Sequence, residues 1–259
     1  MPNLLILVSV SRMMHAMSAS AVTPNSDTQT ERLVLALRER ILKGDFAQGK
    51  RLTELSLVSL LQASRTPIRL ALERLANEGL LDPIPTGGFQ VRSFSMVDVW
   101  DAIEIRGVLE GTAVRFAAER LGPVEELGRV KRLISKATME IPITAEGFAR
   151  YLEINTVFHR ELWCLAKSPT LFRELEHVCK LPFAAPEALV FGLADREQST
   201  AYVAAEQHRA IVEAIENREG ARAEALAREH SRISRRNLEF AFRSKEITSR
   251  LPGAALITN

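Results

Sequence analysis

Three histidines and one asparagine occupy positions from which neighbouring helices could bring their side chains together. Asn155 and His159 are four residues apart, so they project from one face of a predicted helix. His208 and His230 lie on the two helical segments that follow, and each histidine has apolar neighbours at helical spacing. Imidazole and amide groups placed in this way can bind a divalent metal, but spacing alone favours histidines that are satisfied within an apolar core.

Arg106 is the second candidate for chemistry. Apolar residues flank it at helical spacing, which places its guanidinium on the inward side of a helix. A buried cation is costly without an anion. The anion is either a carboxylate of this chain, Glu110 or Glu153, in a structural ion pair, or the carboxylate of a bound ligand gripped through two hydrogen bonds.

A third chemical feature is the stretch 53–80, which predicts two short amphipathic helices around one small core. Their apolar positions recur at helical spacing: Leu57, Leu60 and Leu61 before a turn at Gln62, and Ile68, Leu72 and Leu75 after it. Ser64 is placed to cap the second helix, and Pro67 fits its first turn. That turn carries donor types that reach phosphates and guanine edges in the major groove, namely Arg65, Thr66 and Arg69. A plain helical hairpin with solvated arginines fits the same periodicity.

Two strand-like runs follow this stretch. Leu80-Leu81 and Phe89–Arg92 are joined by a Pro/Gly turn that contains Gly87 and Gly88. Two helices followed by such a hairpin are typical of a winged helix-turn-helix.

The residues before this stretch are expected to complete the winged domain. A helix opens at Thr28 or Thr30 and ends at Gly44, and residues 49–52 form a loop or short strand. Arg51 in that segment is a candidate phosphate contact, although a solvated loop charge fits equally well.

With its wing, this region resembles the winged-helix domain of the GntR family of bacterial transcription regulators. The family pattern reads approximately E-x-x-L-A-x-x-L-G-V-S-R-T-P-V-R-x-A-L-x-x-L-x-x-E-G-L. The matching residues are Glu54, Leu57, Leu61, Ser64, Arg65, Thr66, Pro67, Arg69, Ala71, Leu72, Leu75, Glu78, Gly79 and Leu80. The departures are Val58, Gln62, Ala63 and Ile68, and Gln62 stands at the turn where the family usually has glycine. The DNA contacts expected are Arg51, Ser64, Arg65, Thr66, Pro67, Arg69, Gly87 and Gly88.

Beyond Arg92 the periodicity is helical throughout. Six segments separated by Gly or Pro positions predict an antiparallel α-helical bundle: 95–121, 123–140, 144–168, 170–180, 197–218 and 220–246. The first segment resembles the opening helix of the ligand-binding (FCD) domain of FadR-like GntR regulators, through Arg106, Leu109, Glu110, Ala113, Ala117 and Ala118. The resemblance to the family spans residues 28–245.

This second resemblance implies a metal site and an effector site. The metal is a divalent ion, zinc, nickel or manganese, held by Asn155, His159, His208 and His230, with Asn155 standing where many members have Asp. Arg106 would grip the carboxylate of a small effector. The pocket wall is expected to come from aromatic residues, with Tyr151 and Trp163 foremost and Phe148, Phe183 and Tyr202 as further candidates. The sequence looks most like the vanillate-responsive repressor subgroup, which implies an aromatic acid.

Composition sets the outer limits. The chain has 259 residues, 46% hydrophobic and 25% charged, which is typical of a helix-rich globular protein. Its small positive excess lies in residues 1–92, as an anionic partner requires. Cys164 and Cys179 are too few for a disulfide framework, so the expected compartment is the cytoplasm. The apolar run Leu4–Val10 lacks a basic flank and is too short to span a membrane.

These observations predict a mainly α protein with four parts. Residues 1–27 are a disordered extension, 28–93 a winged helix-turn-helix, 94–246 an all-helical effector-binding and dimerisation domain, and 247–259 a C-terminal tail. The predicted function is that of a homodimeric repressor, which a small carboxylic acid releases from double-stranded operator DNA. Two alternatives remain: a metal-dependent bundle enzyme with Glu153 or Glu161 as its base, and an effector-independent DNA-binding protein.

Overall fold

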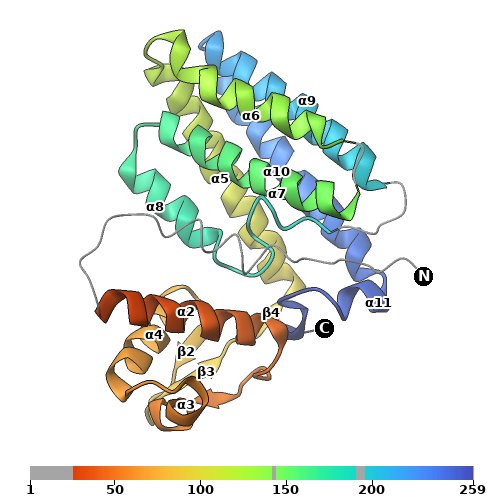
Figure 1. Ribbon diagram of the computed structural model, residues 1–259. Coiled ribbons are helices and arrows are strands. Elements are labelled where there is room, and N and C mark those ends of the chain that lie inside the picture. Colours follow the sequence, from red (N-terminus) through yellow and green to blue (C-terminus); the bar gives the residue numbers. More distant parts are fainter. Residues whose placement is uncertain (1–25, 142–143, 191–195, 259) are drawn as a thin grey trace. The chain divides into compact units, whose positions relative to one another are not determined.

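The computed structural model describes residues 26–141, 144–190 and 196–258, and these fall into two compact units (Figure 1). The winged unit comprises residues 26–98 together with 249–258, and the helical unit comprises the described residues of 99–248. The expected extension lies outside the described residues except at its end, because the first described helix begins at Ser26 rather than at Thr28 or Thr30.

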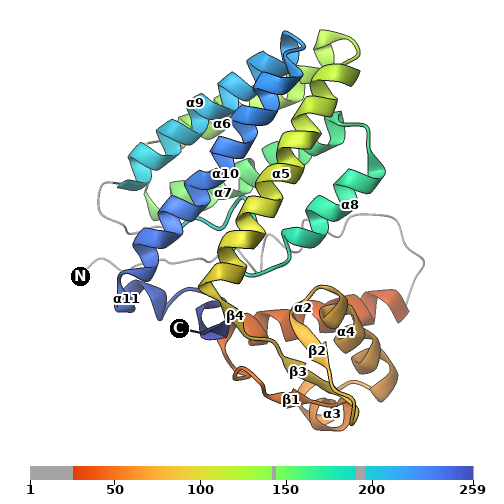
Figure 2. The same cartoon turned by 180° about the vertical axis from the view of Figure 1, so that it is seen from behind.

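The winged unit packs three helices against a small sheet (Figure 2). Its elements are α2 (Ser26–Lys43), β1 (Arg51–Leu52), α3 (Glu54–Leu61), α4 (Arg65–Asn77), β2 (Leu81–Pro83), β3 (Phe89–Val91) and β4 (Phe94–Ser95). Strands β1, β3 and β2 pair antiparallel in that order. The expected apolar positions Ile68, Leu72 and Leu75 are fully buried, which confirms the core of the second helix.

Two local expectations for this unit were wrong. Ser64 holds the N-cap position of α4, but its side chain makes no capping hydrogen bond. Leu60 is 43% exposed, because the short helix α3 buries only the face that carries Leu57. Thr53 instead caps α3 through a reciprocal pair of hydrogen bonds with Ser56.

The chain's C-terminal segment is an ordered part of the winged unit, and the expectation of a separate tail at 247–259 was wrong. After α11 (Lys245–Thr248) it forms η2 (Ala254–Leu256) and β5 (Ile257–Thr258), and β5 pairs parallel with β4. Parallel pairing joins residues far apart in sequence, so local pattern gives no sign of it. Within the described residues, the chain consequently passes between the two units twice, at 98–99 and at 248–249.

The helical unit contains the six helices that the sequence predicts. They are α5 (Met96–Arg120), α6 (Gly128–Met139), α7 (Ala145–Leu165), α8 (Pro169–Val178), α9 (Arg196–Glu216) and α10 (Gly220–Phe242). The segment 123–140 begins as a 3₁₀ turn, η1 (Val124–Leu127), and the last segment breaks after Phe242 before α11. No helix among the described residues is long and apolar enough to cross a bilayer.

Glycines allow α5 and α10 to approach closely. A Cβ at Gly107 would stand 2.3 Å from Ser231 Oγ, and one at Gly111 would stand 3.1 Å from the Glu224 carbonyl oxygen. Residues four apart on a helix share one face, so the two glycines give α10 a flat surface on α5. This approach brings Arg106, the neighbour of Gly107, against the side of α10.

Candidate metal and effector site

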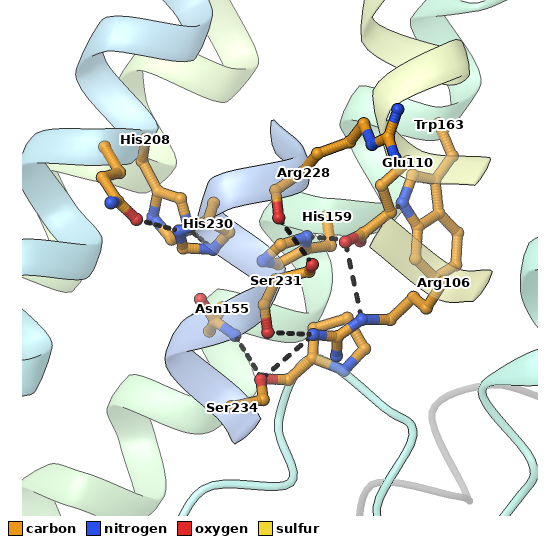
Figure 3. Close-up of polar contacts among 12 residues, drawn as sticks. Arg106, Glu110, Asn155, His159, Trp163, His208, Arg228, His230, Ser231 and Ser234 are labelled. Atoms are coloured by element: carbon orange, nitrogen blue, oxygen red, sulfur yellow. Dashed lines mark hydrogen bonds and ion pairs between the residues drawn. The ribbon is translucent and has the colours of Figure 1, made fainter. Parts of the chain in front are cut away.

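Three histidines from three helices converge inside the helical unit (Figure 3). His159 projects from α7, His208 from α9 and His230 from α10, and all three side chains are buried. One ring nitrogen of each lies within 4.8 Å of those of the other two. The tertiary structure therefore brings together all three histidines that the sequence singled out.

The hydrogen bonds of the rings orient their nitrogens. His159 Nδ1 lies 2.7 Å from Glu110 Oε1, and His230 Nδ1 lies 3.0 Å from Gln207 Oε1. His208 and His230 face each other through their Nε2 atoms, 3.0 Å apart. His159 Nε2 is buried and has no hydrogen-bond partner among the described residues. Two rings thus have Nδ1 engaged, which leaves Nε2 as the atom that can bind a ligand.

Burial keeps two of the imidazoles neutral. It lowers the pKa of His208 well below its usual range, and the neighbouring histidines add to this effect. Burial and the charge of His159 lower the pKa of His230 to about 3. Neutral imidazole is the form that binds a metal, because the ring nitrogen must offer a lone pair.

The fourth expected ligand, Asn155, is buried on α7 one turn before His159. Its Nδ2 donates to the Pro186 carbonyl oxygen at 3.3 Å. An amide whose nitrogen is engaged in this way keeps its oxygen as the atom for a cation. An asparagine in this position brings no negative charge, so a metal here would be held by neutral protein ligands.

Arg106 is fully buried on α5, with only 1% of its surface exposed. Its Nη2 donates to the Ser231 carbonyl oxygen at 3.3 Å and to Ser234 Oγ at 3.1 Å, and its Nε forms an ion pair with Glu110 at 3.6 Å. Nε and Nη1 make no hydrogen bond to the described residues. The structure contains the ion pair with Glu110 that the sequence offered as one possibility. Even so, the N–H groups of Nε and Nη1 remain available for hydrogen bonds to a ligand.

Glu110 connects the arginine with the histidines. Burial alone would raise its pKa, but the charges of His159 and Arg106 outweigh burial and bring the pKa to about 2. Trp163, expected in the pocket wall, donates Nε1 to the same carboxylate at 3.1 Å. Helical spacing shows Glu110 as the i, i+4 neighbour of Arg106, but it gives no sign of the contact that Glu110 makes with α7.

Three further residues lie at this site that were not expected from the sequence. Gln207 precedes His208, Ser234 lies one turn after His230, and Glu187 lies in the segment between α8 and α9. Burial raises the pKa of the Glu187 carboxyl, and the charges of His159 and Arg106 oppose that rise. No periodic signal marks a loop residue such as Glu187, whereas the positions of Gln207 and Ser234 beside the histidines gave a hint.

The aromatic residues expected around the pocket differ in how deeply they are buried. Tyr151 is buried beside Phe148, its hydroxyl has no hydrogen-bond partner among the described residues, and burial raises its pKa. Phe158, which the sequence did not single out, lies 4.1 Å from His208 between ring centroids. Tyr202 is 45% exposed on α9, so of the candidates for the pocket wall it does not contribute to a buried surface.

The donor set fits a divalent metal. His208 Nε2 faces His230 Nε2, and His159 Nε2 is buried with no partner among the described residues; such an arrangement is costly unless a cation or a proton binds between the rings. Nitrogen ligands of this kind suit zinc, nickel or manganese. The candidate bases of the enzyme alternative do not add to this site in the structure: Glu153 is exposed, and Glu161 forms an ion pair with Arg129.

The winged unit presents the residues expected at DNA. Arg65, Thr66 and Arg69 are exposed at the start of α4, with Ser64 exposed beside them and Pro67 half-buried in the first turn. Arg51 donates through Nη2 to the Thr86 and Gly87 carbonyl oxygens at 3.0 and 2.7 Å. Arg51 therefore anchors the wing turn rather than standing free.

Gly87 and Gly88 shape the wing itself. Both have positive φ, and a Cβ at Gly88 would stand 2.8 Å from the Leu52 carbonyl oxygen. An L side chain at either position would strain this turn, so the wing requires both glycines.

The chain combines a winged helix-turn-helix with a helical bundle that encloses a histidine cluster. This combination defines a class of two-domain proteins, and comparison with known sequences identifies the family. Residues 29–91 match the description "Bacterial regulatory proteins, gntR family", and residues 101–232 match the FCD domain. The "Probable D-xylose utilization operon transcriptional repressor" of Paenarthrobacter nicotinovorans is 32% identical over 178 residues, 68% of this chain and 74% of that protein. The chain belongs to the GntR family and carries an FCD domain.

Other similarities have narrower coverage or show the fold alone. The "Nta operon transcriptional regulator" of Aminobacter aminovorans is 30% identical over 133 residues, which are 51% of this chain and 61% of that protein. The chain thus matches less than two thirds of the length of this relative. The E. coli McbR/YncC structure aligns with a TM-score of 0.55 at 22% identity, over 86% of this chain and 99% of that one.

Proposed function

We propose that this protein is a DNA-binding transcriptional regulator that a small carboxylic acid controls through the helical unit. The observation that carries the proposal is Arg106, a buried guanidinium beside a histidine cluster whose Nε and Nη1 have no hydrogen-bond partner in the described part of the chain. A carboxylate offers two acceptor oxygens in the plane that a guanidinium requires, so it fits these donors better than a neutral ligand does. Family membership and the exposed start of α4 support the DNA-binding part.

The proposed metal is divalent and is held by His159, His208 and His230, with the oxygen of Asn155 as the fourth group. When bound, it supplies a positive centre that attracts the effector's carboxylate. The chain's own residues do the rest: Arg106 orients the carboxylate, and the Pro186 carbonyl oxygen, which accepts from Asn155 Nδ2, holds the amide of Asn155 in place. An aromatic effector is the finer proposal, and it rests on the resemblance to the vanillate-responsive subgroup.

The protein is proposed to act as a homodimer, because one winged unit reads a half-site and a two-fold dimer reads a palindrome. Ile105 and Val108 are exposed on one face of α5, and they offer apolar surface for a second copy. Release from DNA requires that the effector prefer the conformation that does not fit the operator, since equal affinity for both states shifts nothing.

One experiment tests both parts. A thermal-shift screen of aromatic acids, sugar acids, dicarboxylates and neutral analogues is combined with binding to DNA from beside the gene, using wild type and Arg106→Ala. We expect the best ligand to be a carboxylic acid that weakens DNA binding, and Arg106→Ala to bind DNA without responding. A neutral best ligand, or an unchanged response of Arg106→Ala, would contradict the carboxylate clamp.

The recognition helix has its own test. Arg65→Ala and Arg69→Ala are each expected to weaken specific DNA binding by roughly 1–3 kcal/mol with little effect on folding. The matched control is Arg74→Ala, an exposed arginine in the last turn of the same helix. Normal binding by both test variants would remove α4 from the proposed interface.

A further inference from the structure

Glu110 is the residue that joins the two halves of the proposed site. It is buried on α5, and its Oε1 accepts from His159 Nδ1 at 2.7 Å and from Trp163 Nε1 at 3.1 Å (Figure 3). Its Oε2 stands 3.6 Å from Arg106 Nε and makes no hydrogen bond to any described residue. One carboxylate thus contacts a proposed metal ligand and the proposed effector clamp at once.

The contact with His159 fixes which ring nitrogen carries the proton. A carboxylate oxygen can only accept a hydrogen bond, so when the His159 ring is neutral, as a metal ligand must be, its proton lies on Nδ1. Nε2 is then left with a bare lone pair, buried and without a partner among the described residues. His230 is held in the same way by Gln207, whose Oε1 lies 3.0 Å from Nδ1.

We propose that Glu110 is a positioning residue, which sets the tautomer and ring orientation of His159 for the metal and at the same time holds Arg106 in place for the effector. This inference rests on the proposed function, because it assumes a metal at the histidines. When a histidine binds a metal through one ring nitrogen and donates the N–H of the other to a carboxylate, it is a stronger metal ligand and loses less entropy on binding. Glu110 also supplies a negative charge next to a metal site whose proposed protein ligands are all neutral.

The opposing explanation is that Glu110 serves only to neutralise the buried Arg106. Such a role predicts loss of stability when Glu110 is changed, but no change in the tautomer of His159. The geometry favours positioning, since the oxygen that forms hydrogen bonds is the one on His159 and Trp163, while the oxygen toward Arg106 forms none.

The test compares zinc affinity and histidine tautomers in the full chain. Zinc is added to chelated protein in competition with a chelator, and long-range ¹H–¹⁵N spectra of metal-free protein report the tautomer of each ring. In Glu110→Gln we expect zinc affinity to fall roughly 10- to 100-fold and His159 to lose its uniform Nδ1–H tautomer. Gln207→Leu is expected to do the same for His230, without touching Arg106.

Glu78→Gln is the matched control, because it removes another buried carboxylate that pairs with an arginine, Arg38, but lies in the winged unit and contacts no histidine of the cluster. Its zinc affinity should stay within a few-fold of wild type. If Glu110→Gln does not fold, Arg106→Gln/Glu110→Gln removes both buried charges. Zinc affinity should still fall in that double variant, even though loss of the arginine by itself favours a cation.

The outcomes separate this inference from the proposed function. Wild-type protein that binds no zinc, nickel or manganese would overturn the metal part of the proposed function, and with it the inference. If His208→Ala abolishes zinc binding while Glu110→Gln keeps wild-type affinity and an Nδ1–H His159, the metal site stands and the positioning role is overturned.

Discussion

Leu256→Ala is expected to destabilise the winged unit, although Leu256 lies only three residues from the end of the chain. The side chain is 0% exposed, and it belongs to η2, which packs against α2. Removing a fully buried leucine costs roughly 2–5 kcal/mol, since the transfer free energy is lost and a cavity remains. For a unit of this size each kcal/mol shifts the melting temperature by roughly 4–8 °C, so we expect a fall of at least about 8 °C.

Neighbouring contacts show why the segment should not simply detach. Gln48 Nε2 donates to the Ala255 and Ile257 carbonyl oxygens at 2.8 and 3.2 Å, and Gly253 N donates to the Leu42 carbonyl oxygen at 2.7 Å. These bonds hold η2 and β5 in register. A chain that stops at Thr248 loses all of them, so it should be destabilised in the same unit.

The assay is hydrogen exchange measured by mass spectrometry on the full chain, together with thermal unfolding. Peptides from α2, α4 and the β1–β3 sheet should lose protection in Leu256→Ala and in the truncated chain, while peptides from α7 keep theirs. Leu55→Ala is the control, since Leu55 is 65% exposed in the same unit and should change stability by less than about 0.5 kcal/mol. Unchanged protection of α2 and α4 in both test proteins would refute the proposal that the C-terminal segment is structural.

Three further changes have expected outcomes. Gln62→Gly should raise the free energy of unfolding by roughly 0.5–1 kcal/mol in a denaturant titration, because Gln62 holds a left-handed φ of 49° at the end of α3. Gly107→Ala should lower it by about 1–3 kcal/mol and weaken effector binding, because the added Cβ would meet Ser231 Oγ at 2.3 Å and displace α10 from Arg106. Metal-free protein should lose stability as the pH falls below about 6.5. Histidines in the unfolded chain take up protons there, whereas buried His230 in the folded protein, with a pKa of about 3, does not, so protonation favours the unfolded state. Urea titrations at pH 7.5 and 5.5 measure the free energy of unfolding at both values.

Each of these predictions has a control. Gln62→Ala keeps the strained φ and should not stabilise the protein. Gly128→Ala should be tolerated, since the nearest atom to its Cβ is Arg132 Nη1 at 3.4 Å. For the pH dependence, His177→Gln changes an exposed histidine and should leave the slope as in wild type, whereas His230→Gln should reduce it. Because His208 also has a lowered pKa, part of the slope should remain in His230→Gln; a slope equal to that of wild type would show that His230 does not contribute to it.

The sequence alone determined the elements and their faces. Helical periodicity, helix-terminating Gly and Pro positions and the turn at Gly87-Gly88 depend on interactions within a few residues, so they can be read locally. The same logic placed His159, His208 and His230 on inward faces, and it placed Arg106 there too. The family resemblance then supplied a reason to expect that these faces share one site.

Only the tertiary structure decided which side chains meet across helices. The hydrogen bond from His159 to Glu110 joins α7 to α5, and the one from His230 to Gln207 joins α10 to α9. Helix rotation and separation set such contacts, and both depend on packing, such as the close approach that Gly107 allows. The pairing of β5 with β4 links residues more than 160 positions apart, Phe94 with Ile257, through backbone groups that are alike at every residue. No pattern of side chains along the sequence specifies that partner, so the structural role of the C-terminal segment emerged only from the folded chain.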